Sequence, residues 1–176
     1  CTYKSEKPEK IPALTNALQI MVSIKEQTDT ETLGITGAIN KRLWYATKVE
    51  SYLDEAIEMY RKGWTRHQDY YTGENYALCL EQKSILEKDE RHKIHKQVEA
   101  EEIRKQIIDI ILPTLEEEEP EELKWKYATL ANCYFALGDV EKGQEYEQKF
   151  KEQNPDEWEI ETFLQNKQNS IHYKNK

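Results

Sequence analysis

Three side chains that bind metals in other proteins lie at helical spacing near the middle of the chain. His92, His95 and Glu99 would project from one face of a helix, where two imidazoles and a carboxylate are suitable ligands for zinc. The segment around them is strongly charged, and the sequence offers no evident fourth ligand. We therefore interpret these residues as a solvated helix face and predict no metal site.

The residues that a nucleophilic enzyme needs do not form a recognisable pattern. Cys79 and Cys133 stand alone, without a CxxC pair, and Cys133 falls on the apolar face of a predicted helix, where a thiol packs rather than reacts. Carboxylates occur throughout the chain, so their pairing carries no information. The sequence also has no glycine-rich phosphate loop. We predict that the protein is not an enzyme and needs no cofactor.

The cysteines also indicate the cellular compartment of the protein. The chain has 3 Cys, and an odd number of dispersed thiols indicates a reducing environment. No stretch approaches the roughly 20 apolar residues that span a bilayer. Cys1 is either a lipid-modified residue left after signal cleavage or the first residue of a trimmed fragment, and we favour the fragment. The prediction is a cytoplasmic protein that does not bind membranes unless Cys1 is lipidated.

Charge and composition restrict the partners and the fold. The net charge of −9 repels phosphate backbones, so we predict no nucleic-acid binding, although a local basic patch could hold a small anion. With 6 Gly and 5 Pro in 176 residues, the chain lacks the turns of a sandwich or barrel. With sandwich and barrel folds excluded, the composition favours helices joined by short polar turns.

Apolar periodicity and turn signals predict about eight helices. A Ser51-x-x-Asp54 pattern indicates a cap for the third helix, and Pro113 ends the long fifth one. The acidic run 116–122 is interpreted as a solvated connector. The predicted helices cover about 9–25, 30–45, 51–67, 69–86, 90–112, 121–137 and 140–152, and the last follows Pro155. We expect a solvated lead-in at 1–8, a helical repeat domain at 9–168 and a polar tail at 169–176.

The segment 124–155 resembles a tetratricopeptide repeat. It has, in the expected order, Leu130-Ala131, Tyr134, Gly138-Asp139 and Pro155. It departs from the repeat at Gly143, where Ala is usual. Two weaker copies precede it, with Gly37 and Ala77 at the helix crossings. The fold predicted is all-α, a tetratricopeptide-like α-solenoid of about eight antiparallel helices in three to four irregular repeats.

Particular blocks narrow the resemblance over residues 28–168. They are ETLG at 31–34, KRLW at 41–44, LDEAIEMYRKG at 53–63, DYYTGEN at 69–75 and WKYAT at 125–129. Together they resemble the TRAFs-binding repeat region of the apoptosis signal-regulating kinases. That region recurs in bacterial proteins as a proposed ligand sensor. The resemblance implies a regulatory repeat domain in signalling, without a kinase.

In repeats of this kind the first helix of each pair lines a concave groove. Mapping from the helix crossings places six candidate binding residues toward it: Lys41, Arg42, Tyr71, Glu74, Trp125 and Asn132. The alternative is that Trp125 and Tyr71 pack between repeats and that Arg42 pairs with a nearby Glu. Trp44 and Trp64 lie on apolar stripes and are expected in the core. Asn75 is expected to cap the fourth helix.

Two functions remain open. The groove could hold a protein or peptide partner, or another domain of a longer chain, as an interaction scaffold. It could instead bind a small anionic, nucleotide-derived ligand and regulate an effector, because Arg, Lys and aromatic side chains suit such a ligand. A sensor needs basic groups that converge in a pocket, whereas a scaffold needs an open groove.

Overall fold

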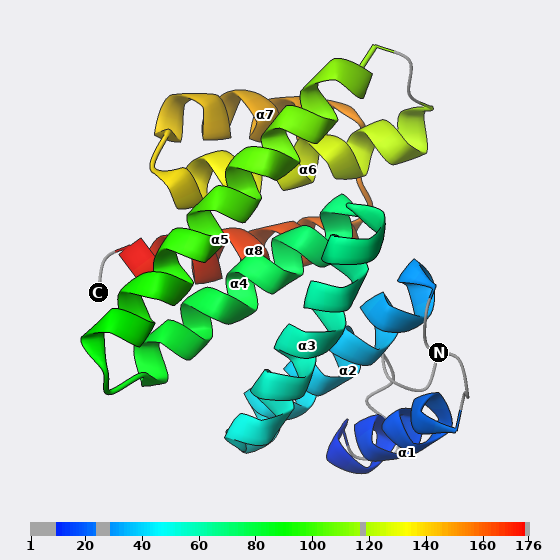
Figure 1. The fold of residues 1–176 in the computed structure, drawn as a ribbon. Coiled ribbons are helices and arrows are strands. Elements are labelled where there is room, and N and C mark those ends of the chain that lie inside the picture. Colours follow the sequence, from blue (N-terminus) through cyan, green and yellow to red (C-terminus); the bar gives the residue numbers. More distant parts are fainter. Residues whose placement is uncertain (1–9, 24–28, 117–118, 175–176) are drawn as a thin grey trace. The chain divides into compact units, whose positions relative to one another are not determined.

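The structure is a computed structural model that describes residues 10–23, 29–116 and 119–174. The predicted lead-in at 1–8 lies outside the described residues. Within these ranges the chain forms eight α-helices and one short 3-10 turn, and no strand (Figure 1). The prediction of an all-α fold with about eight helices is confirmed. The helices are α1 (Lys10–Val22), α2 (Thr30–Thr47), α3 (Glu50–His67), α4 (Tyr70–Leu86), α5 (Glu90–Ile111), α6 (Pro120–Leu137), α7 (Val140–Glu152) and α8 (Glu157–Lys174), with η2 at Leu112–Thr114.

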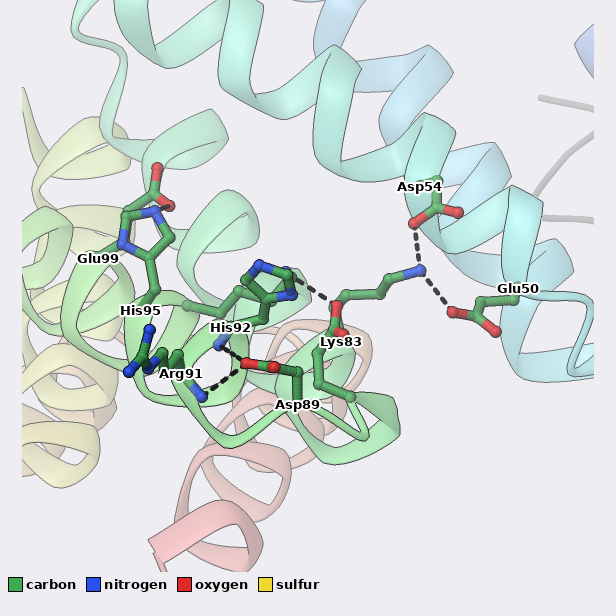
Figure 2. Close-up of polar contacts among 10 residues, drawn as sticks. Glu50, Asp54, Lys83, Asp89, Arg91, His92, His95 and Glu99 are labelled. Atoms are coloured by element: carbon green, nitrogen blue, oxygen red, sulfur yellow. Dashed lines mark hydrogen bonds and ion pairs between the residues drawn. The ribbon is translucent and has the colours of Figure 1, made fainter.

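Aspartates begin several of these helices. Asp29, Asp69, Asp89 and Asp139 each accept a hydrogen bond from a backbone N–H in the following first turn, at 2.8 to 3.1 Å. Figure 2 shows Asp89 in this role at the start of α5. These bonds satisfy N–H groups that have no partner inside the helix, which is why each helix starts where it does.

The predicted cap of α3 is wrong. The residue before α3 is Val49, which makes no side-chain cap, and Ser51 lies inside the helix. The carboxylate of Asp54 instead lies 2.5 Å from the Lys83 ammonium, which also contacts Glu50 at 2.5 Å (Figure 2). These ion pairs join α3 to α4. Asp54 therefore stabilises packing between helices rather than the start of its own.

The chain divides into two compact units, Cys1–Lys83 and Ser84–Lys176. In the first unit α2 and α3 form an antiparallel hairpin, and Leu33 of α2 and Leu53 of α3 are fully buried. Gly37 lies at the crossing, because an added Cβ there would come within 2.8 to 2.9 Å of the Tyr60 ring. Leu14 of α1 belongs to a hydrophobic cluster with Ile39 and Leu43 of α2. The small residue predicted at this crossing, Gly37, is needed because the Tyr60 ring leaves no room for a Cβ atom.

In the second unit, α6 packs against α5, α7 and α8. Ala131 is fully buried on α6, and Gly143 of α7 faces Phe135. The rings of Phe150 on α7 and Phe163 on α8 lie 5.0 Å apart and close the core between those helices. Gly143, the departure from the usual repeat, accommodates the large Phe135 side chain.

The C-terminal helix continues beyond the predicted repeat domain. α8 runs to Lys174, and Ser170 is buried, so the segment expected to be a polar tail at 169–176 is helical through 174. The end of the acidic run leads into α6: Pro120 occupies the first position of the helix, and the exposed Glu121 and Glu122 lie in its first turn. That 9–168 acts as one repeat domain stays a prediction.

Candidate functional site

In the first unit, one turn of α2 faces the start of α4 and brings predicted binding residues together. The Lys41 ammonium donates a hydrogen bond of 2.5 Å to Oδ1 of Asn75, and the Asn75 amide donates one of 2.8 Å to the carbonyl of Tyr71. Asn75 is 4% exposed. The prediction that Asn75 caps α4 is wrong, because Asp69 caps that helix and Asn75 lies a turn and a half inside it. Asn75 instead positions the Lys41 ammonium.

Several charges share this place. Loss of water lowers the pKa of Lys41 from its ordinary 10.5; the Glu74 carboxylate opposes this effect and the Arg42 guanidinium adds to it. Lys41 is partly exposed as a residue, so the desolvation concerns its ammonium end. Glu74 is 9% exposed. The ammonium is therefore less stabilised than in water, and an added anionic group beside it would be favourable.

Two tyrosines form the aromatic part of the cluster. Tyr60 of α3 is fully buried, whereas Tyr71 is 46% exposed, and their rings meet edge to face with centroids 6.4 Å apart. The Lys41 ammonium lies 5.9 Å from the centre of the Tyr60 ring. Tyr71 thus offers an exposed ring beside a buried cation. We name the residues Lys41, Arg42, Tyr60, Tyr71, Glu74 and Asn75 the α2–α4 cluster.

Two weakly acidic groups in or beside the α2–α4 cluster, Tyr60 and Cys79, are shifted toward the protonated form. Burial raises the pKa of the Cys79 thiol to about 12, although the Lys41 ammonium opposes this shift. Burial also raises the pKa of Tyr60 well above 10. At neutral pH both groups are protonated, so neither is an activated nucleophile.

The other two predicted site residues lie in the second unit, both on α6. Trp125 is partly exposed and packs against Trp158 of α8, with ring centroids 5.8 Å apart. Asn132 is 3% exposed, inside the packed faces of α6. Seven residues separate Trp125 from Asn132, about 10 Å along one helix face. That all six residues line one groove stays a prediction.

Sequence reasoning missed the roles of Tyr60 and Trp158 beside the predicted residues. The sequence signal for Tyr60 was Gly37, which marks where its ring packs against α2. No spacing rule links Trp158 to Trp125. Trp44 and Trp64 are 9% and 6% exposed, which confirms that both belong to the core.

The residues considered as a metal site do not gather into one. The His95 imidazole lies 3.8 Å from the Glu99 carboxylate, while the backbone N–H of His92 donates to Asp89 (Figure 2). Over the described part of the chain, no three His, Cys, Asp or Glu side chains are placed to hold one ion. Nor does any helix in those ranges have the length and apolar character needed to cross a bilayer.

Residues 1–80 match the sequence model of the Tetratricopeptide Repeats-Sensor family. The match covers the α2–α3 hairpin and the part of α4 that carries Tyr71, Glu74 and Asn75. The resemblance to a tetratricopeptide sensor region that the sequence predicts is thereby confirmed over these residues, as is the tetratricopeptide-like all-α fold. Comparison with curated proteins and with solved structures gave no match.

Proposed function

We propose that this chain is a non-catalytic binding module whose helical hairpins hold a protein or peptide partner in a regulatory assembly. The observation that carries the proposal is the α2–α4 cluster, where Lys41, Arg42 and the exposed Tyr71 ring lie together at the place where α2 faces the start of α4. Aromatic and arginine side chains dominate the binding energy of protein interfaces. The tetratricopeptide match over residues 1–80 supports a repeat that binds rather than catalyses.

The chemistry of the cluster indicates an acidic group on the partner. Lys41 and Arg42 bring two cations beside the Glu74 carboxylate, and the pKa of Lys41 is lowered by loss of water. A carboxylate or phosphate that reached the Lys41 ammonium would restore the stabilisation that water no longer gives. Tyr71 would then cover the apolar atoms next to that group. The cluster therefore fits an acidic segment with a neighbouring apolar side chain.

A sensor of a small anionic ligand is the second candidate. The specific observation in its favour is that the Lys41–Asn75 pair is built inside the unit, where a compact ligand rather than a flat protein surface would reach it. The family that residues 1–80 match is also a tetratricopeptide sensor family. In this alternative, a nucleotide-derived compound would place its phosphate at Lys41 and its ring against Tyr71, and a partner or attached effector would respond.

A thermal-shift screen of the purified chain distinguishes the two. Nucleotides and ADP-ribose-like compounds form one panel, and short acidic and basic peptides form the other. A ligand that binds only the folded state raises the melting temperature by mass action. A shift with acidic peptides alone supports the interaction module, whereas a shift with a nucleotide-like compound supports the sensor. No shift in either panel would move the search to folded protein partners.

Variants test the assignment of the site. Arg42→Ala and Tyr71→Ala should each abolish most of the shift, whereas Arg66→Ala, which removes an exposed cation from α3, should not. Arg42→Lys keeps the charge but loses the planar fork, so an intermediate result is expected. The helicity of each variant must equal that of the parent. If Arg42→Ala unfolds the chain, Arg42 is structural and the assignment of this residue fails.

A further inference from the structure

A second surface with binding chemistry lies in the second unit, outside the residues that match the family. Its centre is the pair of Trp125 on α6 and Trp158 on α8, whose rings are tilted by 43° at 5.8 Å. Trp158 is 50% exposed. The core face of α8 carries Glu159, Phe163 and Ser170, which are 2 to 3% exposed, so the core does not account for Trp158.

A buried ion pair fixes the two indoles. Lys124 lies next to Trp125 and is 8% exposed; its ammonium lies 2.8 Å from the carboxylate of Glu159, which follows Trp158. Glu159 also accepts a hydrogen bond of 2.7 Å from the backbone N–H of Asp156, which closes the start of α8. The indole positions are therefore set before any partner arrives, and this lowers the entropic cost of binding.

Carboxylates surround the pair. Glu122 lies one turn before Trp125 on α6, and Glu157 and Glu161 lie beside Trp158 on α8; all three are exposed. Lys124 and Lys126 flank Trp125 in the sequence and are 8% and 7% exposed. The Lys126 ammonium donates a hydrogen bond to Thr114, and the charge of Lys124 is matched by Glu159 and by Glu121 at 2.8 and 3.1 Å. The surface thus combines the negative faces of two indoles with an excess of negative charge.

This combination selects a cation. Indole is the best side-chain acceptor of a cation–π contact, and the Lys124 ammonium already lies 5.9 Å from the centre of the Trp125 ring. Arginine suits the place better than lysine, because its planar guanidinium stacks on an indole while it bonds a carboxylate through two N–H groups. We propose that Trp125, Trp158 and the carboxylates beside them bind an arginine-containing segment of a protein partner.

The test is a binding titration of the full chain with a short Gly/Ser peptide that carries several arginines. The same peptide with citrulline, which keeps the shape and loses the charge, is the control ligand. We expect the citrulline peptide to bind weakly, and Trp158→Ala to reduce affinity for the arginine peptide about fivefold, the effect of one partly exposed cation–π contact. Equal affinity for the two peptides, or full affinity in Trp158→Ala, would overturn the proposal.

Matched carboxylate variants separate a local contact from attraction to the whole acidic chain. Glu161→Gln should weaken binding, whereas Glu141→Gln should not: Glu141 is equally exposed but lies at the start of α7, next to the end of α6 opposite to Trp125. If both variants weaken binding equally, net charge alone attracts the peptide and the site assignment is wrong. Arg42→Ala should bind the arginine peptide normally, so failure here and failure at the α2–α4 cluster are distinguishable.

A measurement on the unaltered chain covers the case in which Trp158→Ala fails to fold. The chain has 4 Trp, and Trp44 and Trp64 are buried in the first unit. In a titration followed by indole N–H resonances, the arginine peptide should shift those of Trp125 and Trp158 and leave the other two unchanged. A uniform response of all four, or no response, would contradict the proposal.

Discussion

Replacing Gly143 by alanine should destabilise the protein, although alanine is the usual residue at this point of the repeat. In an open helix, Gly→Ala adds about 1 kcal/mol of stability. At Gly143 the new Cβ would stand 2.6, 2.7 and 2.9 Å from Cδ1, Cε1 and Cγ of Phe135. Phe135 is 5% exposed, and the Lys167 ammonium lies 4.1 Å from the centre of its ring, so the ring has little room to retreat.

The magnitude follows from these two opposing effects. Overpacking a close-packed core by one methyl group costs about 1–3 kcal/mol, and contacts to the root of a rigid ring belong at the upper end. After the gain in helix propensity is subtracted, the free energy of unfolding should fall by about 2 kcal/mol. Urea unfolding followed by far-ultraviolet circular dichroism measures this change as a lower midpoint at an unchanged slope.

A second background tests the reason for the change as well as its sign. In Phe135→Leu the ring is gone, so adding Gly143→Ala should become neutral or stabilising by up to about 1 kcal/mol. The double-mutant cycle would then give a favourable coupling between the two positions. If Gly143→Ala raises the midpoint in the wild-type background, the steric argument is refuted and helix propensity alone governs the position.

Three further predictions concern a cap, the thiols and an ion pair. Asp69→Ala should lower the free energy of unfolding by about 1 kcal/mol because α4 loses its N-cap, whereas Asp69→Asn should retain most of it in the same urea assay. Cys79 and Cys133 should resist iodoacetamide in the folded chain and react in denaturant, because both are buried and the pKa of Cys79 is raised to about 12; peptide mapping by mass spectrometry reports each site, and rapid labelling of the folded chain would contradict the burial. Burial alone would raise the pKa of Glu147, but hydrogen bonds from lysines, Lys167 among them at 2.5 Å, lower it from 4.5. The ionised Glu147 carboxylate therefore contributes its full stabilisation above pH 4.5 and loses it as the pH falls through the lower pKa of the folded state. The melting temperatures of wild type and Glu147→Gln should converge in acid. A constant difference between them would exclude this linkage.

The helices could be predicted because their signals are local. Asp29, Asp89 and Asp139 mark starts that the structure places next to them, and Gly138, with φ of 86°, ends α6 in the left-handed conformation that glycine adopts without strain. Apart from the end of α8, every predicted helix boundary that the structure describes lies within a few residues of the observed one. Periodicity and caps involve residues within one or two turns of the same helix, so the local sequence contains them.

The contacts that make the sites could not be predicted in the same way. Asn75 was expected to cap a helix because it follows Gly73, yet its amide serves Lys41, 34 residues earlier. Trp158 joins Trp125 only because α6 and α8 pack together. Such pairs depend on which helix faces which, and the spacing of residues along one helix does not contain that information. The ion pairs of Lys83, Lys124 and Lys167 also join residues of different helices.

The position of α4 has a practical consequence for dissecting the protein. The family match ends at residue 80 and the compact units divide after Lys83, but α4 continues to Leu86. A truncation at either point would cut through a helix and leave carbonyl groups of its last turn without their N–H partners. A cut at 80 would also discard Lys83 and leave the carboxylates that it bridges on α3 without a counter-ion. An expression fragment of the first unit should therefore extend at least to residue 88, in the turn before α5, so that its solubility reports on the unit rather than on a severed helix.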